Sequence, residues 1–146
     1  MMVVEGQKMG RFAVEFEIAN NRDIAAALSG HLDPAQVRRK KIKGTVDPGA
    51  TLLVLPLAVV KELGLPVKKQ KIKVRYADGR RGVRTEAEEI RVTLQGRDGT
   101  FTAIVEPKRE IALIGAIVLE TLDFLVDSRK ERLVPRDPDY VVSEVE

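Results

Sequence analysis

The sequence predicts a mainly β fold in which short sheets close or pack orthogonally into a barrel, with one or two short helices. Two observations predict it. Several short segments alternate apolar and polar residues, which is the pattern of half-buried strands. Turn-forming pairs such as Asp78-Gly79 and Asp98-Gly99 stand between these segments. The 146 residues, 44% of them hydrophobic, are enough for one compact domain with a core.

The first half of the chain contains two predicted strands before an acidic loop. Residues 11–18 alternate, with four apolar side chains on one face: Phe12, Val14, Phe16 and Ile18. Residues 20–23 are typical of a turn, and residues 24–32 fit a short helix or a loop that ends at Asp33-Pro34. Residues 37–46 form the next predicted strand, which is basic at its start, turns apolar and leads into Asp47.

The rest of the chain predicts a buried strand, a short helix and a series of hairpins. Residues 52–55 form the buried strand, and a helix over residues 57–63 is framed by Pro56 and Gly64. Residues 69–76 alternate, residues 77–82 form a hairpin tip, and residues 83–94 return with an interruption at 86–89. A second turn over residues 95–99 leads to further elements: strands at 100–105 and 111–114, a helix at 116–121, and a strand pair at 124–126 and 132–134.

These elements define one domain over residues 9–135, between a flexible N-terminus (1–8) and an acidic C-terminal tail (136–146). The absence of cysteine and the single histidine, His31, argue against a disulfide framework, a thiolate or histidine zinc site and a Ser-His-Asp triad. We expect no cofactor and no metal. The longest apolar runs are broken by Pro56 and Gly115, and no secretory signal is apparent, so a cytoplasmic protein without a membrane span is predicted.

The chain is organised around Asp47. This carboxylate stands in the most apolar part of the first half, with no Lys or Arg between Gly44 and Val60. Pro48-Gly49 directly after it predicts a turn, so Asp47 should lie where a strand ends. An acid walled by Leu and Val is typical of a catalytic site, but buried, hydrogen-bonded turn aspartates are common as well. The pattern alone leaves both interpretations open.

Residues 45–51, TVDPGAT, resemble the active-site loop of the retropepsin-like (retroviral-type) aspartic proteases, which normally reads Asp-Thr-Gly-Ala or Asp-Ser-Gly-Ala. A second signature of that family, two apolar residues and a glycine that open a helix, resembles Leu113-Ile114-Gly115. The resemblance covers about residues 36–135. It implies a retropepsin-like acid-protease fold, Asp47 as the catalytic acid, and a flap hairpin that covers a peptide substrate. The remaining implied site residues are Pro48, Gly49, Ala50 and Thr51 in the loop and Tyr76, Ala77, Asp78, Gly79 and Gly82 in the flap.

Peptide hydrolysis by this chemistry needs two carboxyl groups that share a proton. Asp78-Gly79 and Asp98-Gly99 lie in polar turns and are interpreted as turn formers, so the chain supplies one acid. The resemblance therefore implies a homodimer in which Asp47 meets its symmetry mate. The expected function is an aspartic endopeptidase that acts on a peptide or protein.

Two other functions remain open. Pro48 replaces the Thr or Ser whose hydroxyl, in this family, donates across the dimer interface, and proline has neither that hydroxyl nor an N–H. A catalytically impaired or inactive dimeric peptide-binding or assembly domain is therefore the main alternative. The net charge of +3 and two basic stretches, residues 38–43 and 69–75, permit nucleic-acid binding. The chain has few aromatic residues to stack on bases, which disfavours that function.

Overall fold

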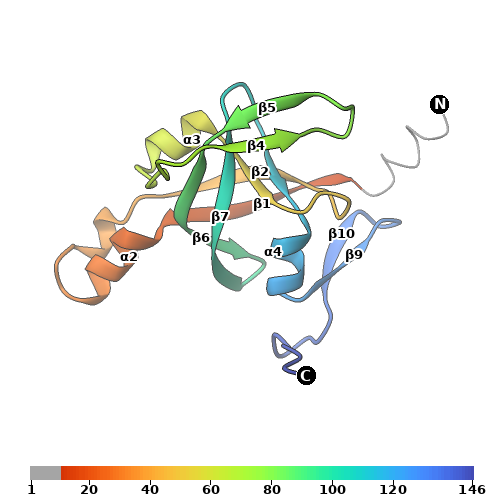
Figure 1. Cartoon of the computed structure of the whole chain (residues 1–146). Coiled ribbons are helices and arrows are strands. Elements are labelled where there is room, and N and C mark those ends of the chain that lie inside the picture. The colour runs from red at the N-terminus through yellow and green to blue at the C-terminus, as the bar shows by residue number, and fades with distance from the viewer. Residues whose placement is uncertain (1–10) are drawn as a thin grey trace.

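A closed six-stranded barrel forms the body of the molecule in the computed structural model, which describes residues 11–146 (Figure 1). Its strands follow the order β1-β2-β8-β3-β7-β6 around the barrel. β2 pairs with β8, and β3 with β7, in parallel, whereas the other neighbours are antiparallel. The barrel strands are β1 (Phe12–Asn20), β2 (Arg39–Val46), β3 (Leu53–Pro56), β6 (Glu86–Leu94), β7 (Arg97–Glu106) and β8 (Ala112–Ile114). The predicted mainly β, barrel-like fold is confirmed.

Two separate hairpins and three short α-helices complete the described chain. The first hairpin joins β4 (Ile72–Arg75) to β5 (Arg81–Arg84), and the second joins β9 (Phe124–Asp127) to β10 (Arg132–Pro135). The helices are α2 (Asn21–Leu28), α3 (Leu57–Glu62) and α4 (Ala116–Thr121), with a 3-10 turn, η1, at Pro34–Gln36. None of the helices in residues 11–146 has the length and apolar character that a bilayer span requires. The N-terminal segment expected to be flexible, residues 1–8, lies outside the described residues.

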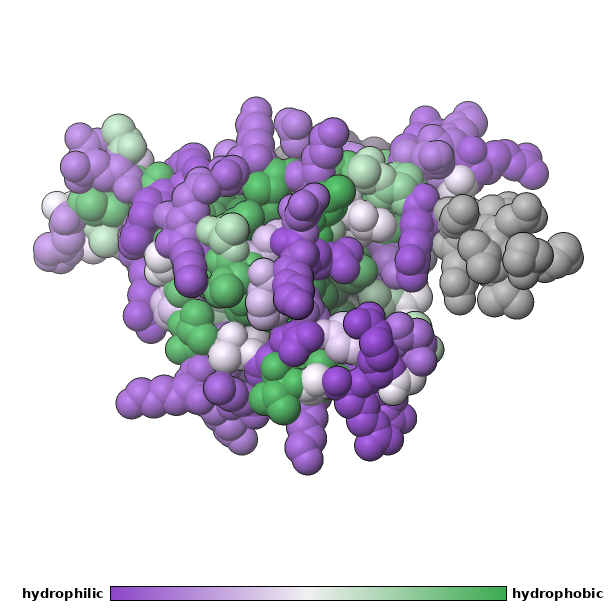
Figure 2. Space-filling model, turned by 90° about the horizontal axis from the view of Figure 1, so that it is seen from above, coloured by the Kyte–Doolittle hydropathy of each residue, from purple (hydrophilic) through white to green (hydrophobic). Residues whose placement is uncertain are grey.

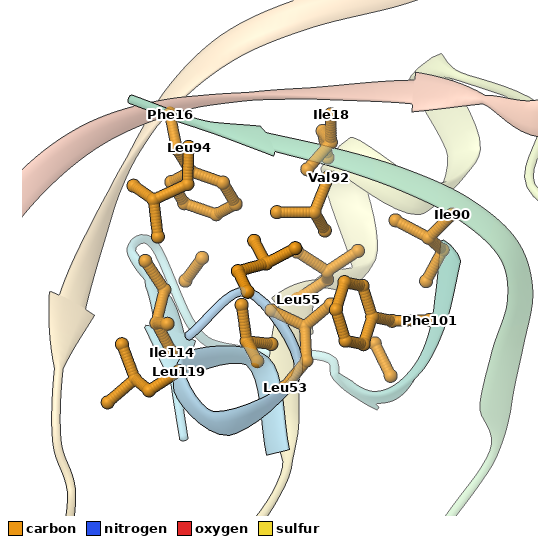
Figure 3. Packing of buried hydrophobic residues seen from close by; sticks show 14 of the residues in the cluster. Phe16, Ile18, Leu53, Leu55, Ile90, Val92, Leu94, Phe101, Ile114 and Leu119 are labelled. Carbon is orange, nitrogen blue, oxygen red and sulfur yellow. The ribbon is translucent and has the colours of Figure 1, made fainter. Parts of the chain in front are cut away.

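The core fills the barrel with the inward faces of the alternating strands. Figure 3 shows side chains from β1, β3, β6, β7, β8 and α4 meeting in this interior. Ile18, Leu53, Leu55, Ile90 and Leu94 are completely buried. Burial of such side chains contributes about 1.5–3 kcal/mol each relative to exposure, so this interior is the main source of the stability that holds the loops at the barrel's ends.

The boundary between β1 and α2 differs from the prediction. Residues 20–23 were expected to form a turn, but β1 continues to Asn20 and the helix begins at Asn21. The Asn20 side chain caps the helix by accepting a hydrogen bond from the Asp23 N–H at 3.0 Å. The same buried side chain donates to Leu63 O at 2.9 Å, which ties the junction to the end of α3. Asparagine favours helix caps as well as turns, so composition alone did not separate them.

The hairpin between β6 and β7 is tighter than expected. Gln95 and Gly96 alone form the turn, with φ values of 47° and 81°, the backbone of a two-residue hairpin loop. Asp98 and Gly99 were interpreted as turn formers, but they lie inside β7. They pair there with Thr93 and Val92. The interruption expected at residues 86–89 is a bulge between Ala87 and Ile90, where Glu89 has a φ of 57°.

Candidate active site

Asp47 stands at the end of β2, where the barrel opens into a loop. Its backbone N–H donates to Ile114 O at 3.0 Å, which extends the parallel pairing of β2 with β8 by one residue. The Ala50 N–H donates to Asp47 O at 3.0 Å, so residues 47–50 close a β-turn with Pro48 and Gly49 in the middle. The side chain of Asp47 is buried and Pro48 is exposed. A buried acid thus stands where β2 ends, as the Pro-Gly turn predicts.

Both oxygens of the Asp47 carboxylate have partners. Oδ1 accepts the Gly49 N–H at 3.0 Å, and a Cβ on Gly49 would lie 3.3 Å from the same oxygen. Oδ2 lies 3.0 Å from Nη2 of Arg11, whose side chain is half exposed. The antiparallel register, with Phe12 opposite Val46, brings Arg11 to this position. Nothing in the spacing of the chain singles out Arg11, because its proximity to Asp47 depends on which strand pairs with β2.

The second sequence signature packs directly on the Asp47 loop. The N–H groups of Ala116 and Ile117, in the first turn of α4, donate to Ala50 O at 2.7 Å and Thr51 O at 2.9 Å. Gly115 makes this approach possible, since a Cβ there would meet Leu52 O at 2.4 Å. Leu113 and Ile114 lie in β8, between β2 and β3. The structure therefore brings the two sequence signatures into contact.

The hairpin β4–β5 stands beside the same loop. Its turn comprises residues 76–80, where the Tyr76 N–H donates to Arg80 O and the Gly79 N–H to Tyr76 O, both at 2.9 Å. Gly79 has a φ of 89°, which a glycine adopts without strain. The tip is shorter than the predicted 77–82, because Gly82 lies in β5 opposite Val74. Ala77 and Asp78 occupy the tip as expected, and Arg80 pairs with Asp78 at 2.7 Å.

Glu106, at the end of β7, binds one side chain from β5 and one from the turn of this hairpin, just after β4. Its Oε1 accepts a hydrogen bond from Arg84 Nε at 2.7 Å, and its Oε2 accepts one from the Tyr76 hydroxyl. Burial and the hydrogen bond to Glu106 raise the pKa of Tyr76. The same carboxylate raises the pKa of Arg84. Glu106 and Arg84 were not predicted from the sequence, since a lone acid before a proline and one arginine among several carry no signal.

A cavity of about 390 Å³ lies between the Asp47 loop and the hairpin. Residues 49–52 line it from the loop and residues 74–76 from the hairpin, and Ile104, Glu106, Arg109 and Leu113 complete its wall. The apolar wall with a few charged groups is the usual composition of a pocket for a small ligand or a side chain. Tyr76, one of the implied flap residues, lines this cavity.

Three other aspartates lie outside the Asp47 loop. Asp98 pairs with Arg91 at 2.7 Å on the barrel surface. The backbone N–H of Arg80 holds the pKa of Asp78, at the hairpin tip, below its usual range. Asp123 is buried but bonded to Arg136 at 2.8 Å beside the C-terminal segment. Within residues 11–146 no group of three or more His, Cys, Asp or Glu side chains is arranged to hold a metal ion.

The two basic stretches differ in their pairing. In the first, Arg38 pairs with Asp23, Arg39 with Glu17 and Lys40 with Glu62. In the second, four exposed cations have no carboxylate within 4.0 Å among the described residues: Lys69, Lys71, Lys73 and Arg75. The first stretch is therefore largely neutralised, and uncompensated positive charge gathers on the hairpin.

Comparisons with known proteins identify a family and structures of similar fold. A family model described as aspartyl protease matches residues 34–126, which include the Asp47 loop, the hairpin and the Gly115 segment. The retroviral protease-like domain of Ddi1 from Leishmania major superposes with a TM-score of 0.50 at 16% identity, covering 85% of this chain and 88% of that one. The EIAV protease complexed with an inhibitor gives a TM-score of 0.44 at 17% identity, covering 56% and 77%. No curated protein matches the chain by sequence.

Proposed function

Because the chain belongs to the aspartyl protease family, we propose that it is an aspartic endopeptidase of the retropepsin-like type. The observation that carries the proposal is the setting of Asp47. The buried carboxylate of Asp47 follows the buried end of β2, accepts the Gly49 N–H, and sits in a loop fixed to Gly115 and the first turn of α4. The cavity between this loop and the hairpin supports the same function, because a peptide side chain could occupy it.

Catalysis would require two copies of the chain. Aspartic proteases activate water with two carboxyl groups that share one proton, and the loop holds one such group, that of Asp47. We infer that Asp47 of one protomer faces Asp47 of its partner across a twofold axis. One carboxylate then takes a proton from the attacking water while the other protonates the scissile carbonyl oxygen. Leu52, in the same loop, is 45% exposed, and burial of that apolar surface would favour such an interface.

The deciding experiment is peptide cleavage by the full chain from acid to neutral pH, together with sedimentation to measure its oligomeric state. We expect a dimer whose cleavage of a peptide library falls about 10²- to 10⁴-fold in Asp47→Asn. Asp98→Asn removes a carboxylate outside the loop and serves as the control. A peptide inhibitor with a hydroxyl in place of the scissile carbonyl should block the cleavage. A monomeric protein, or equal cleavage by Asp47→Asn, would refute the proposal.

A second candidate is a dimer of the same fold that binds peptides without hydrolysing them. Two observations favour it: Pro48 replaces a residue with a hydroxyl, and Arg11 occupies Oδ2 of Asp47. This candidate predicts that peptide binding, measured by calorimetry or fluorescence polarisation, is the same in the protein and in Asp47→Asn, and that neither cleaves the peptide.

A further inference from the structure

The hairpin β4–β5 is only lightly attached to the barrel. It forms a two-stranded sheet of its own, outside the barrel's strand order (Figure 1). At its base, the Val105 N–H donates to Thr85 O at 3.0 Å, and the Lys68 N–H donates to Glu86 O at 2.9 Å. A hairpin held at its base alone is marginally stable and free to tilt. The position of its tip over the cavity therefore depends on contacts farther along the two strands.

Glu106 supplies those contacts from a rigid part of the molecule. It ends β7 and pairs with Pro56 of β3, and its side chain is only 14% exposed. Its two oxygens are divided between the two edges of the hairpin: Oε1 accepts from Arg84 of β5, and Oε2 accepts from Tyr76, just after β4. One carboxylate thus connects both strands to the barrel beside the cavity.

The aromatic ring of Tyr76 strengthens this connection. The guanidinium of Arg80 lies 4.9 Å from the ring centre and that of Arg84 lies 5.7 Å from it, both within the range of cation–π attraction. Tyr76 and Glu106 both line the cavity. The position of the hairpin and the shape of the cavity are therefore set by the same group of side chains.

We propose that Glu106 is a positioning residue that fixes the hairpin relative to the barrel, beside the cavity. The role in substrate binding rests on the proposed function, whereas the attachment itself does not. Only a carboxylate suits this place, because it accepts at both oxygens. A glutamine would present an NH₂ group to either the Tyr76 hydroxyl or the Arg84 guanidinium, and a donor facing the guanidinium would lose that bond.

Amide hydrogen exchange tests the attachment without any need for turnover. We expect the amides of residues 72–84 to exchange about tenfold faster in Glu106→Gln, while those of β6 keep their protection. Asp98→Asn is the matched control, since it also removes a carboxylate of β7 that pairs with an arginine at 2.7 Å, and it does not contact the hairpin. Equal exchange in Glu106→Gln and the unaltered protein, or an equal increase in Asp98→Asn, would overturn the proposal.

A spectroscopic titration provides a second, independent measurement. The chain has two tyrosines, Tyr76 and Tyr140, so a Tyr140→Phe background reports Tyr76 alone through its phenolate absorbance. Glu106 helps to raise the pKa of Tyr76, so Glu106→Gln in this background should lower that pKa. If Glu106→Gln fails to fold, Tyr76→Phe and Arg84→Gln each remove one of the two bonds and should each speed exchange of the hairpin. An unchanged titration, or unchanged exchange in both single variants, would contradict the assignment.

If the protein cleaves peptides, the kinetics of Glu106→Gln distinguish the positioning role of Glu106 from the proposed protease function. A hairpin that holds the substrate equally in the ground and transition states affects KM rather than kcat. We expect KM to rise about tenfold in Glu106→Gln with kcat within about twofold. Loss of kcat alone would contradict a positioning role. An inactive protein whose hairpin still loosens in Glu106→Gln would refute the proposed protease function and leave the attachment in place.

Discussion

At the residue scale, the contact between Arg11 and Asp47 opposes the proposed chemistry. Nη2 of Arg11 occupies the space beside Oδ2, and Gly49 occupies Oδ1. A second carboxylate needs access to one of these oxygens in order to share a proton. The Gly49 bond lies within the turn and fits an aspartic dyad, whereas Arg11 is on a neighbouring strand end and half exposed. In the proposed dimer, Arg11 is therefore the group that must move.

Replacement of Arg11 should promote activity. An ion pair of this exposure contributes about 0.2–1 kcal/mol, and a dimer breaks two of them, so Arg11→Gln should favour the active arrangement by a few-fold to about thirtyfold. The measurement is the rate of peptide cleavage against protein concentration. Arg39→Gln is a close control, because Arg39 is also 49% exposed and pairs with Glu17 on the same two strands. A lower rate in Arg11→Gln would mean that Arg11 assists Asp47 instead.

At the scale of elements, local patterns predicted most strands, and long-range pairing decided the rest. The alternation of residues 11–18 and the run 116–121 matched β1 and α4 because each reflects a single buried face. The turn after Asp47 also agreed with the Pro48-Gly49 pair, whereas its contact with the Gly115 segment was not predicted. Arg11 and Glu106 were not predictable, since their roles depend on β1–β2 and β3–β7 registers that the sequence does not reveal.

Substitution of Gly115 tests whether the Asp47 loop depends on its close contact with the segment that begins α4. A Cβ at this position would lie 2.4 Å from Leu52 O and 2.7 Å from Leu52 N, and backbone atoms cannot move without displacing the loop. We expect Gly115→Ala to lower the free energy of unfolding by about 1–3 kcal/mol and to abolish cleavage. Chemical denaturation and the peptide assay measure the two effects.

Gly30 provides the control for Gly115. It has a φ of 80°, and nothing lies within 4 Å of the Cβ it would carry. Asparagine adopts this backbone conformation at a lower cost than most residues, so Gly30→Asn should lower stability by less than Gly115→Ala and leave cleavage unchanged. Full activity in Gly115→Ala would show that the approach of α4 to the loop is not required.

At the scale of the whole molecule, positive charge gathers on the face that the hairpin covers. Figure 2 views the molecule from that side, and hydrophilic side chains project over most of this face. Lys73, Arg75 and Arg81 are exposed there without a carboxylate partner among the described residues. Several acids elsewhere in the molecule are paired with a base, as Asp23 is with Arg38 and Glu17 with Arg39. The fold therefore uses its carboxylates in ion pairs and turns, which links its stability to pH.

Acid should destabilise the protein through these carboxylates. The side-chain hydrogen bond from Arg38 lowers the pKa of Asp23, and the Lys130 N–H lowers that of Asp127. A lowered folded-state pKa gives stability that is present above the unfolded value of about 3.9 and is lost as the pH falls through the folded value. Denaturant titrations should show the free energy of unfolding falling below about pH 4. Asp23→Asn should be less stable at neutral pH and show a shallower acid dependence.

Arg38→Gln is the reciprocal test of the same pair. It should reproduce part of the loss seen in Asp23→Asn, because it removes the side-chain pair but keeps the hydrogen bond from the Arg38 backbone N–H to Asp23. The double variant should lose little more than Asp23→Asn. Additive losses would show that the two residues act separately.

The loss of stability in acid also affects the cleavage assay, because unfolding at low pH would imitate the titration of a catalytic dyad. Circular dichroism under the assay conditions distinguishes the two causes.

A threonine in place of Pro48 should have opposite effects on dimer affinity and on the stability of each protomer. A threonine there would restore a hydroxyl that, in the resemblance to retropepsin-like proteases, donates across the dimer interface. Two such bonds at about 0.5–1.5 kcal/mol each should tighten the dimer of Pro48→Thr by about fivefold to 150-fold. Loss of the fixed proline φ should lower the stability of each protomer by about 0.4–1 kcal/mol.

Sedimentation at several concentrations measures the first effect of Pro48→Thr, and denaturation of the dilute protein measures the second. Pro34→Thr is the control, because Pro34 is also exposed and also follows an aspartate, but it lies in η1 before the start of β2. It should lower protomer stability without altering dimerisation. If Pro48→Thr leaves the dimer dissociation constant unchanged, residue 48 does not lie at a protomer interface, and the dyad proposed for Asp47 loses its structural basis.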